Sequence, residues 1–268
     1  MRIAVVAPSC PLKREAAEAV QAIAATRGDC ELVIHPQCFS ESGHFAGPDA
    51  ERLAGLREVM ADPAIDAVWF ARGGYGSNRI AEAAVRDLPA AARGKTYLGY
   101  SDAGFLLAAL HKAGLEVAHG PMPSDVLRSD GEAAVSRALD WLVRRDPSAL
   151  ELGLSGPALA FNLVVLSSLL GTPLEPDFAG RELLIEEVDE EHYRIDRFLF
   201  HVTSQPTIRK VRQIRLGRCL VKENDRPFGA DEEAIARDWC VRAGIAYAGR
   251  ADIGHDVANK VVPFSPAP

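Results

Sequence analysis

The amino-acid sequence predicts an α/β protein built around a parallel sheet with helices on both faces, joined to a smaller second domain. Short apolar segments alternate with segments of helical periodicity through the first half of the chain, which is the pattern of right-handed β-α-β units. The texture changes over residues 147–156, which we interpret as a linker. The length of 268 residues and the hydrophobic content of 48% suit two domains, predicted at residues 1–146 and 157–268.

The first domain opens with a strand, RIAVVAPS, and a helix that ends at Gly28, a residue typical of helix C-termini. Four further strands are predicted from apolar segments, namely CELVIHP, IDAVWFARGGYG, TYLGY and LEVAHGPM. Helices are predicted between or after them, at DAERLAGLREVMAD, SNRIAEAAVRD, residues 104–112 and EAAVSRALDWLVRR. Because strands alternate with helices, the strands are expected to run parallel.

The second domain has fewer clear signals. NLVVLSSLLGTP is predicted to be a helix closed by Gly171, and RELLIEEV to be a strand. Helical periodicity also marks YRIDRFLFHVTSQ and DEEAIARDWCVRAG. The segment IRKVRQIRLGRC is mixed and does not favour either type of element.

Composition and charge argue against several classes of partner. The net charge is −7 and no block of lysine and arginine is present, which disfavours nucleic acid or an anionic membrane surface. The N-terminal MRIAVVAPSCP has too short an apolar run, and no small-residue cleavage site, to be a signal peptide. Five cysteines without CxxC spacing indicate a reduced, cytoplasmic protein. No HExxH or clustered His/Cys motif occurs, so we expect neither a metal nor another cofactor.

Ser101 lies at the junction between a predicted strand and a predicted helix, in the segment GYSDAG. A serine at such a tight turn exposes its Oγ, and the unpaired N–H groups of the helix start can stabilise an oxyanion. The alternative is that Ser101 only caps the helix, since serine is among the preferred N-cap residues. The segment is not the GxSxG nucleophile elbow, because Ala103 replaces its second glycine.

A second junction, ARGGYGSNR at residues 71–79, contains three glycines. Such a loop lets the backbone approach a ligand closely, and its adjacent N–H groups can form an anion-binding nest. It matches neither GxGxxG nor the Walker loop, so a nucleotide cofactor is not expected. A tight turn with two solvated arginines is the structural alternative.

A nucleophilic serine needs a base, and the base usually needs an orienting carboxylate. Spacing does not select among the seven histidines, although His119, at a strand end of the first domain, is a rival to His255 in the turn DIGHDVAN. Glu186 follows LLI and is expected at the end of its strand. The remaining acids of LLIEEVDEEHYRIDR are predicted to form a solvated turn; they are Glu187, Asp189, Glu190 and Glu191.

Taken together, these segments resemble the serine LD-carboxypeptidase family, which also includes the microcin C immunity peptidases. The resemblance spans nearly the whole chain in order, through IAVVAPS, ARGGYGSNR, GYSD, HGPM, NLVVLSSLLGTP, LLIEEVDEEHYRIDR and GHDVANKVVP. It implies that Ser101 is the nucleophile, Glu186 the orienting acid and His255 the base. It also implies an oxyanion hole made by the backbone N–H groups of Gly74 and Asp102, while the Asp102 carboxylate is expected to cap the helix.

The same resemblance implies the architecture and assembly. The first domain is expected to be a flavodoxin- or amidotransferase-like parallel sheet, and the second a smaller, mixed, β-rich domain. The active site would lie between the two, and the protein would be a homodimer. The implied activity is removal of the terminal D-alanine from a cytoplasmic muropeptide tetrapeptide during murein recycling, with no metal or other cofactor.

Four residues are candidates for substrate binding. Arg72 and Arg79 flank the glycine loop, and an arginine suits the terminal carboxylate that a carboxypeptidase must recognise. Asn162 matches an asparagine of the family, and Phe161 is the aromatic residue expected near the cleft. The family usually has a glycine pair before this asparagine, where Ala160 and Phe161 stand here, so these two side chains are expected to influence substrate choice.

Three alternative functions remain open on the sequence. A microcin C-type hydrolase would cleave a peptidyl or aminoacyl nucleotide and would need an aromatic platform for the base. An esterase of the α/β-hydrolase type shares the order serine, acid, histidine, but its elbow and its HGGG-type loop are absent. A non-catalytic protein could use a cleft between the domains to bind a peptide or a sugar.

Overall fold

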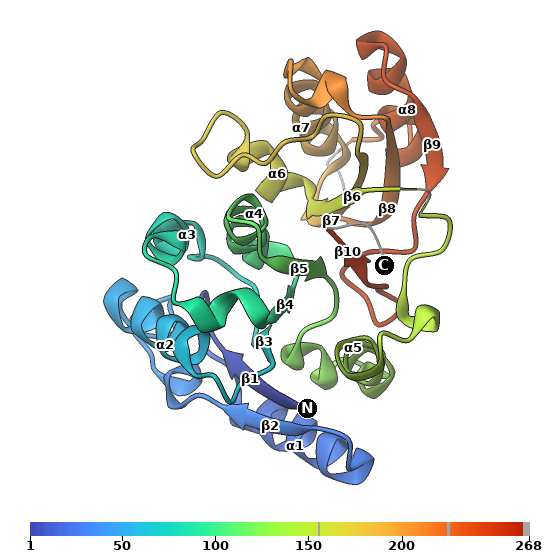
Figure 1. The fold of residues 1–268 in the computed structure, drawn as a ribbon. Coiled ribbons are helices and arrows are strands. Elements are labelled where there is room, and N and C mark those ends of the chain that lie inside the picture. Colours follow the sequence, from blue (N-terminus) through green and yellow to red (C-terminus); the bar gives the residue numbers. More distant parts are fainter. Residues whose placement is uncertain (155, 224–225, 265–268) are drawn as a thin grey trace.

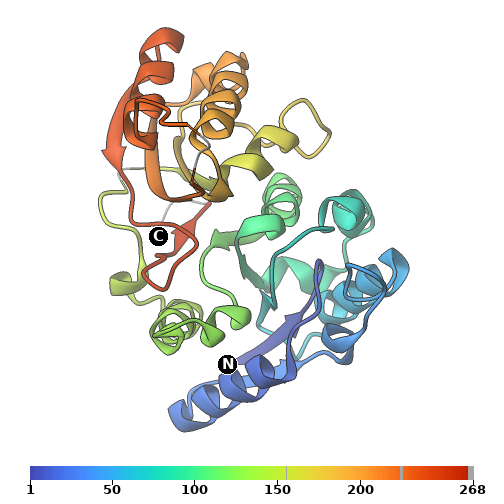
Figure 2. The same cartoon turned by 180° about the vertical axis from the view of Figure 1, so that it is seen from behind.

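The computed structural model describes residues 1–154, 156–223 and 226–264, and it confirms the predicted α/β fold class. Within these residues a six-stranded and a four-stranded sheet form two lobes, which lie side by side in Figure 1 and are seen from behind in Figure 2. Residue 155 of the predicted linker and residues 265–268 lie outside the described residues. The domain boundaries themselves stay a prediction.

The first sheet has the strand order β10-β5-β4-β3-β1-β2. Neighbours among the first five strands pair in parallel, as the alternation with helices predicted. Their bounds are β1 Arg2–Val6, β2 Glu31–Ile34, β3 Ala67–Phe70, β4 Thr96–Gly99 and β5 Glu116–His119. Strand β10, Val262–Pro263, returns from the end of the chain and pairs antiparallel with β5.

Helices cover both faces of this sheet, because successive strand residues point to opposite faces and both sets are apolar. Ile3 and Val5 belong to one buried cluster together with side chains of α1 Arg14–Arg27 and α5 Gly131–Arg144. Ala4 and Val6 belong to the other buried cluster, with side chains of the helices on the opposite face. Those helices are α2 Asp49–Ala61, α3 Asn78–Val85 and α4 Gly104–Lys112.

The second sheet has the order β6-β7-β8-β9, and every described pairing in it is parallel. Where the sequence predicted a mixed, β-rich domain, helical crossovers therefore connect parallel strands, as parallel pairing requires. The strands are β6 Ala158–Asn162, β7 Glu182–Glu190, β8 Gln213–Val221 and β9 Tyr247–Arg250. The helices are α6 Leu163–Leu169, α7 His192–Ser204 and α8 Glu232–Ala243, seen in the upper lobe of Figure 1.

Short 3-10 helices occupy several connections of the chain. They are η1 Pro36–Phe39, η2 Ala90–Gly94, η3 Ser101–Ala103, η4 Pro123–Leu127, η5 Pro147–Ala149 and η6 Ile208–Lys210. Two of them, η3 and η4, are the next elements after β4 and β5, at the carboxyl end of the first sheet. This is the edge at which ligands bind in open α/β sheets.

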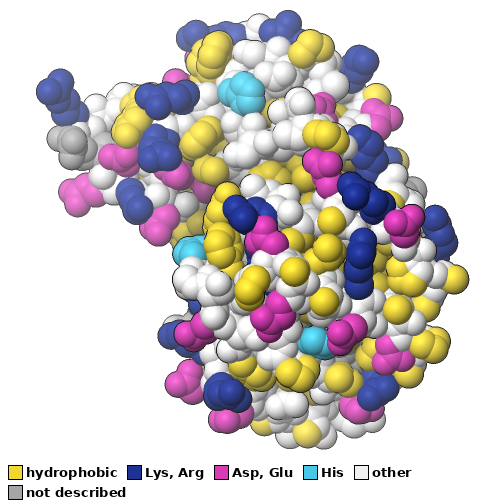
Figure 3. Space-filling model, turned by 90° about the vertical axis from the view of Figure 1, so that its left-hand side faces the viewer, with side chains coloured by type: hydrophobic (Ala, Val, Ile, Leu, Met, Phe, Trp, Pro, Cys, Tyr) yellow, Lys and Arg dark blue, Asp and Glu magenta, His cyan; other side chains and the backbone are white. Residues whose placement is uncertain are grey.

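Acidic and basic side chains are interspersed over both lobes on the face shown in Figure 3, without a broad area of one sign. Within the described ranges, no helix is both long and apolar enough to cross a bilayer.

Candidate active site

Ser101 is the first residue of η3, in the sharp turn after β4. Its φ angle is 59°, in the left-handed region that a residue with a Cβ atom rarely occupies. The turn needs a glycine before it, because a Cβ atom on Gly99 would lie 2.8 Å from a ring carbon of Phe70. Strained backbone of this kind often occurs at functional sites, where the surrounding structure holds it.

The structure brings together the three residues that the sequence predicted as nucleophile, base and acid. Ser101 Oγ lies 2.9 Å from His255 Nε2, and His255 Nδ1 lies 2.5 Å from Glu186 Oε2. Ser101 comes from the first lobe, Glu186 from β7, and His255 from the loop after β9. With Nδ1–H donating to the carboxylate, Nε2 is free to accept the hydroxyl proton of Ser101, which is the geometry of a serine-peptidase triad.

Burial strengthens the electrostatic interaction between Glu186 and His255. Glu186 is fully buried and His255 is nearly so. Burial by itself lowers the pKa of the His255 imidazole, but the charge and the hydrogen bond of Glu186 outweigh it, with smaller contributions from Glu187 and Asp125. The pKa of His255 is therefore raised above its ordinary value, and the imidazole is a stronger base than a free histidine.

The loop that carries His255 is held by contacts on both sides. Arg218 of β8 donates to both oxygens of the Asp256 carboxylate, at 2.9 Å for Oδ1. The backbone N–H of Gly254 donates to the Asn259 side chain at 3.1 Å. Arg137 of α5 donates to the carbonyl of Val257 at 2.8 Å, so the loop is fixed to the first lobe as well. These contacts position the imidazole toward Ser101.

The rival base, His119, has a different environment. It is buried in β5, and neither ring nitrogen has a hydrogen-bond partner in the described part of the chain. Its ring packs against Tyr100, at 5.5 Å between centroids. Burial, with a smaller effect from His255, lowers the pKa of His119 to about 3. His119 is therefore a neutral side chain of the interior that makes no hydrogen bond to Ser101.

The glycine loop touches the nucleophile. A Cβ atom on Gly73 would lie 2.9 Å from Ser101 Oγ, and one on Gly74, which has φ 104°, would overlap the sulfur of Cys10. Gly74, Ser101 and Asp102 line the same cleft. Among the described residues, the backbone N–H groups of Gly74 and Asp102 donate to no protein group. Both are thus available to an oxyanion formed at Ser101.

Gly74→Ala is expected to lower kcat/KM for amide hydrolysis by about 100- to 1,000-fold, the usual cost of losing an oxyanion-hole donor. The added methyl group clashes with Cys10 and must displace the loop. The matched control is Gly28→Ala, because Gly28 also has a positive φ, of 68°, but no atom lies within 4 Å of the added carbon. Equal activities of the two variants in steady-state kinetics would contradict a role of the Gly74 N–H group in the oxyanion hole.

The expected role of the Asp102 carboxylate is wrong. It does not cap the helix that follows; it accepts hydrogen bonds from Ser9 Oγ at 2.5 Å and from the backbone N–H of Ser77 at 2.8 Å. It thereby ties the turn of Ser101 to the loop after β1 and to the start of α3. This contact orients the segment that contains the Asp102 N–H group.

A cleft of about 460 Å³ lies beside Ser101. Asn162 contributes to its wall and caps α6, accepting from the Val165 N–H at 3.1 Å and donating to Glu187 Oε1 at 2.8 Å. This placement keeps Asn162 a candidate for contact with substrate. The helix predicted at NLVVLSSLLGTP is α6, which begins at Leu163, and residues 158–162 before it form β6.

The prediction that Glu187 belongs to a solvated turn is wrong. β7 continues to Glu190, and a shift of register between Ile185 and Glu187 lets both Glu186 and Glu187 be buried. Glu187 accepts from Asn162 and from the backbone N–H groups of Val164 and Val188 at 2.8–2.9 Å. Burial, with a smaller effect of the Glu186 charge, raises the pKa of Glu187 to about 7. Sequence patterns do not report a bulge, so this residue was missed.

Glu187→Gln is expected to lower the free energy of unfolding by about 1–3 kcal/mol. The carboxylate now accepts hydrogen bonds from three N–H groups, and the amide NH2 of glutamine would face one of these donors without being able to accept from it. Urea denaturation at neutral pH measures this change. The control is Glu190→Gln, which disturbs a more exposed ion pair with Arg194 and is expected to cost about 0.5 kcal/mol. Equal stability of the Glu187 variant and the wild type would contradict the role of Glu187 as a buried acceptor.

Three of the candidate binding residues lie away from this cleft. The assignment of Phe161 to the cleft is wrong: its ring is 1% exposed and packs against Phe178 and Phe264 in the core. Ala160 is buried beside it in β6, so this pair fills the interior. Arg79 is paired with Asp49 and does not line the cleft. Arg72 lines a separate cavity.

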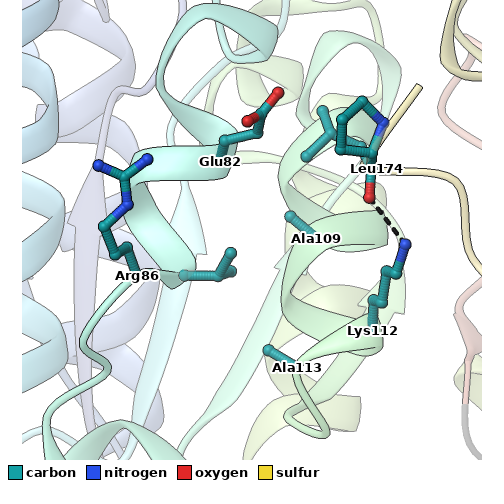
Figure 4. A pocket seen from close by; sticks show the side chains of 8 residues that line it. Glu82, Arg86, Ala109, Lys112, Ala113 and Leu174 are labelled. Carbon is teal, nitrogen blue, oxygen red and sulfur yellow. Dashed lines mark hydrogen bonds between the residues drawn. The ribbon is translucent and has the colours of Figure 1, made fainter.

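Another cavity, of about 340 Å³, lies between α3 and α4 (Figure 4). Lys112 crosses one side of it and donates to the carbonyl of Pro173 at 2.8 Å. None of the predicted site residues lines this cavity, so it is separate from the Ser101 cleft.

Comparison with known proteins shows the family to which the chain belongs. The model of the LD-carboxypeptidase N-terminal domain matches residues 3–120, and that of the C-terminal domain matches residues 155–266. The "Probable murein peptide carboxypeptidase" of Bacillus subtilis is 31% identical over 84% of this chain and 75% of its own. The murein tetrapeptide carboxypeptidase of Pseudomonas aeruginosa is 28% identical over 98% of this chain and 91% of its own.

Solved structures share the fold. The muramoyltetrapeptide carboxypeptidase of Oxalobacter formigenes has a TM-score of 0.84 at 25% identity, covering 99% of this chain and 93% of its own. The microcin C7 self-immunity protein in complex with aspartyl sulfamoyl adenosine has a TM-score of 0.81 at 18% identity, covering 98% and 91%, a likeness of fold alone. The esterase and non-catalytic alternatives are set aside. The chain belongs to the LD-carboxypeptidase family and is a serine carboxypeptidase.

Proposed function

We propose that Ser101, His255 and Glu186 are the catalytic triad of this carboxypeptidase. The observation that carries the proposal is the continuous hydrogen-bonded row from Ser101 Oγ through His255 to Glu186, with distances of 2.9 and 2.5 Å. Two further features support it: the left-handed backbone of Ser101 and the raised pKa of His255.

The reaction follows from these contacts. His255 Nε2 takes the proton of Ser101 as Oγ bonds to the scissile carbonyl carbon, and the carbonyl π electrons move to the oxygen. The N–H groups of Gly74 and Asp102 receive that negative charge. When the intermediate collapses, the C–N bond breaks and His255 gives the proton to the leaving amine. Water then attacks the acyl-serine with His255 again as base, releasing the acid and restoring Ser101.

We further propose that the substrate is a muropeptide tetrapeptide, from which the terminal D-alanine is removed. The relatives named as murein peptide and tetrapeptide carboxypeptidases support this substrate class. The cleft beside Ser101 offers polar groups of Asn162, Asn78 and Ser168 to the acyl part of such a peptide. A role in murein recycling would follow from this activity.

The test is incubation of purified protein with L-Ala-γ-D-Glu-meso-diaminopimelate-D-Ala, with release of D-alanine measured by a coupled oxidase assay. D-Alanine release by the wild type, and its loss in Ser101→Ala, are expected. A wild type that releases no D-alanine would contradict the substrate assignment.

A second candidate is hydrolysis of an aminoacyl or peptidyl nucleotide. The observation in its favour is Tyr75, which is 47% exposed, lines the cleft and offers an aromatic face to a base. Stacking of this kind contributes about 1–3 kcal/mol per base in nucleic-acid complexes. Rapid cleavage of an aminoacyl sulfamoyl adenosine without D-alanine release would favour this function over the first.

The cytoplasmic location and the homodimer are also proposals. Recycled muropeptides are a cytoplasmic substrate class, which motivates the location. Cell fractionation tests the location, and light scattering coupled to gel filtration tests the dimer; a membrane-bound or monomeric protein would contradict the respective proposal.

A further inference from the structure

A separate cavity, of about 260 Å³, shares no lining residue with the cleft beside Ser101. Its wall is formed by the start of α1, by Arg72 in the loop after β3 and by the η4 turn. The side chains that matter here are Lys13, Arg72, Ser124, Asp125 and Arg128. The cleft beside Ser101, by contrast, is lined by residues of α3, α4, α6 and β7.

The charge of this cavity is positive. Asp125 is its acidic residue, and its carboxylate is already engaged by Tyr100 Oη at 2.8 Å, by the Met122 N–H at 2.8 Å and by Arg128 at 3.0 Å. Lys13 and Arg72 form no ion pair with a carboxylate in the described part of the chain; Arg72 donates to the Pro11 carbonyl at 3.3 Å. Two cations are thus available to an anion.

The backbone at the N-terminus of α1 adds to the positive potential of this cavity. Lys13 is the N-cap of α1, and no side chain caps the first turn of that helix. The unpaired N–H groups and the positive end of the helix dipole therefore lie beside the two cations. The cavity is smaller than the roughly 300–1,000 Å³ of sites for drug-sized ligands, so it suits a ligand the size of one amino acid.

The cavity also adjoins the reacting atoms. Arg72 directly precedes Gly73, and Gly73 lies against the nucleophile: a Cβ atom added to it would be 2.9 Å from Ser101 Oγ. On the other side, Asp125 binds the hydroxyl of Tyr100, and the Tyr100 ring lies 4.8 Å from the ring of His255. Residues of the cavity wall are thus linked to the nucleophile through Gly73 and to the base through Tyr100. In acyl transfer the base gives its proton to the leaving amine, so the leaving group lies near His255.

From this arrangement we propose that the cavity is the subsite for the leaving amino acid, and that Lys13 and Arg72 bind its free carboxylate. The carboxylate of a terminal residue is separated from the scissile nitrogen by a single Cα atom, which places it next to the segment of Arg72. The inference rests on the proposed function. It explains the preference for chain ends, because an internal residue has no carboxylate for the two cations.

The experiment compares two peptides that end in the same D-alanine, one with a free carboxylate and one with a carboxamide. The wild type is expected to prefer the acid. Arg72→Gln and Lys13→Met are each expected to lower kcat/KM for the acid by about 10- to 100-fold, the usual effect of losing a charged hydrogen bond. The carboxamide, which never made that contact, is expected to change by about twofold or less.

Arg14→Gln is the matched control, because it removes a positive charge beside Lys13 from a side chain that stacks on Phe39 and does not line the cavity. Its acid-to-amide ratio is expected to equal that of the wild type. Unchanged ratios in both Arg72→Gln and Lys13→Met, with hydrolysis intact, would overturn the subsite. A wild type that cleaves neither peptide would instead overturn the proposed function.

Discussion

Replacement of Ser101 by alanine is expected to lower kcat for D-alanine release by about 10,000-fold or more, because no nucleophile is left to form the acyl-enzyme. The Oγ–H of Ser101 is the group that donates to His255 Nε2, with 2.9 Å between Oγ and Nε2. The rest of the site is retained, so binding is expected to persist. Isothermal titration with the same peptide measures that binding, and single-turnover kinetics measure the chemistry.

The double variant Ser101→Ala/His255→Ala provides the sharper test. Residues that act as one unit lose activity together, so the second substitution is expected to lower the residual rate by only a small factor. Circular dichroism and urea denaturation check that each variant is folded. Independent, multiplicative losses for Ser101 and His255 would contradict a shared role, and near-normal turnover by Ser101→Ala would contradict the mechanism.

The sequence was sufficient to predict the main features that place the nucleophile. Alternating apolar and helical segments predict the parallel sheet, and ligands bind at the carboxyl ends of such strands. Ser101 and the glycines at residues 73–76 lie at the ends of two neighbouring strands, β4 and β3. Local patterns are enough here, because each functional residue directly follows its own strand.

The partners of Ser101 could not be chosen from local patterns. His255 is 154 residues away from Ser101 along the chain, and Glu186 is 69 residues away from His255. Spacing left seven histidines open, and only the resemblance to a family selected His255. His119 was a reasonable rival by position, but tertiary packing places its ring against Tyr100 in the interior.

Other errors have the same physical origin in tertiary contacts. Glu187 is buried because β7 changes register there, and the sequence EEVDEE reads as a polar turn. Phe161 lies close to Asn162 in sequence, yet its side chain points into the core between Phe178 and Phe264. The Asp102 carboxylate has long-range partners, Ser9 and Ser77, that compete successfully with local helix capping.

Glu186→Gln is expected to lower kcat by about 10,000-fold while leaving the three side chains in place. The carboxylate now accepts the Nδ1–H of His255 at 2.5 Å. The amide NH2 of glutamine can instead donate to Nδ1, which favours the tautomer with its proton on Nε2. That nitrogen then cannot accept the proton of Ser101, so the base is lost although its position is kept.

The same substitution is expected to change the pH dependence of the residual activity. In the wild type, kcat/KM rises with pH as His255 loses its proton, and the midpoint lies above the ordinary histidine pKa because Glu186 outweighs the effect of burial. In Glu186→Gln the burial of His255 remains and the negative charge is gone, so the midpoint moves to lower pH.

Glu187→Gln is the comparison: Glu187 also raises the pKa of His255 but makes no hydrogen bond to it. It is expected to shift the midpoint slightly downward with a small loss of kcat. A Glu186→Gln profile that coincides with the wild type would show that this carboxylate does not set the proton affinity of the base.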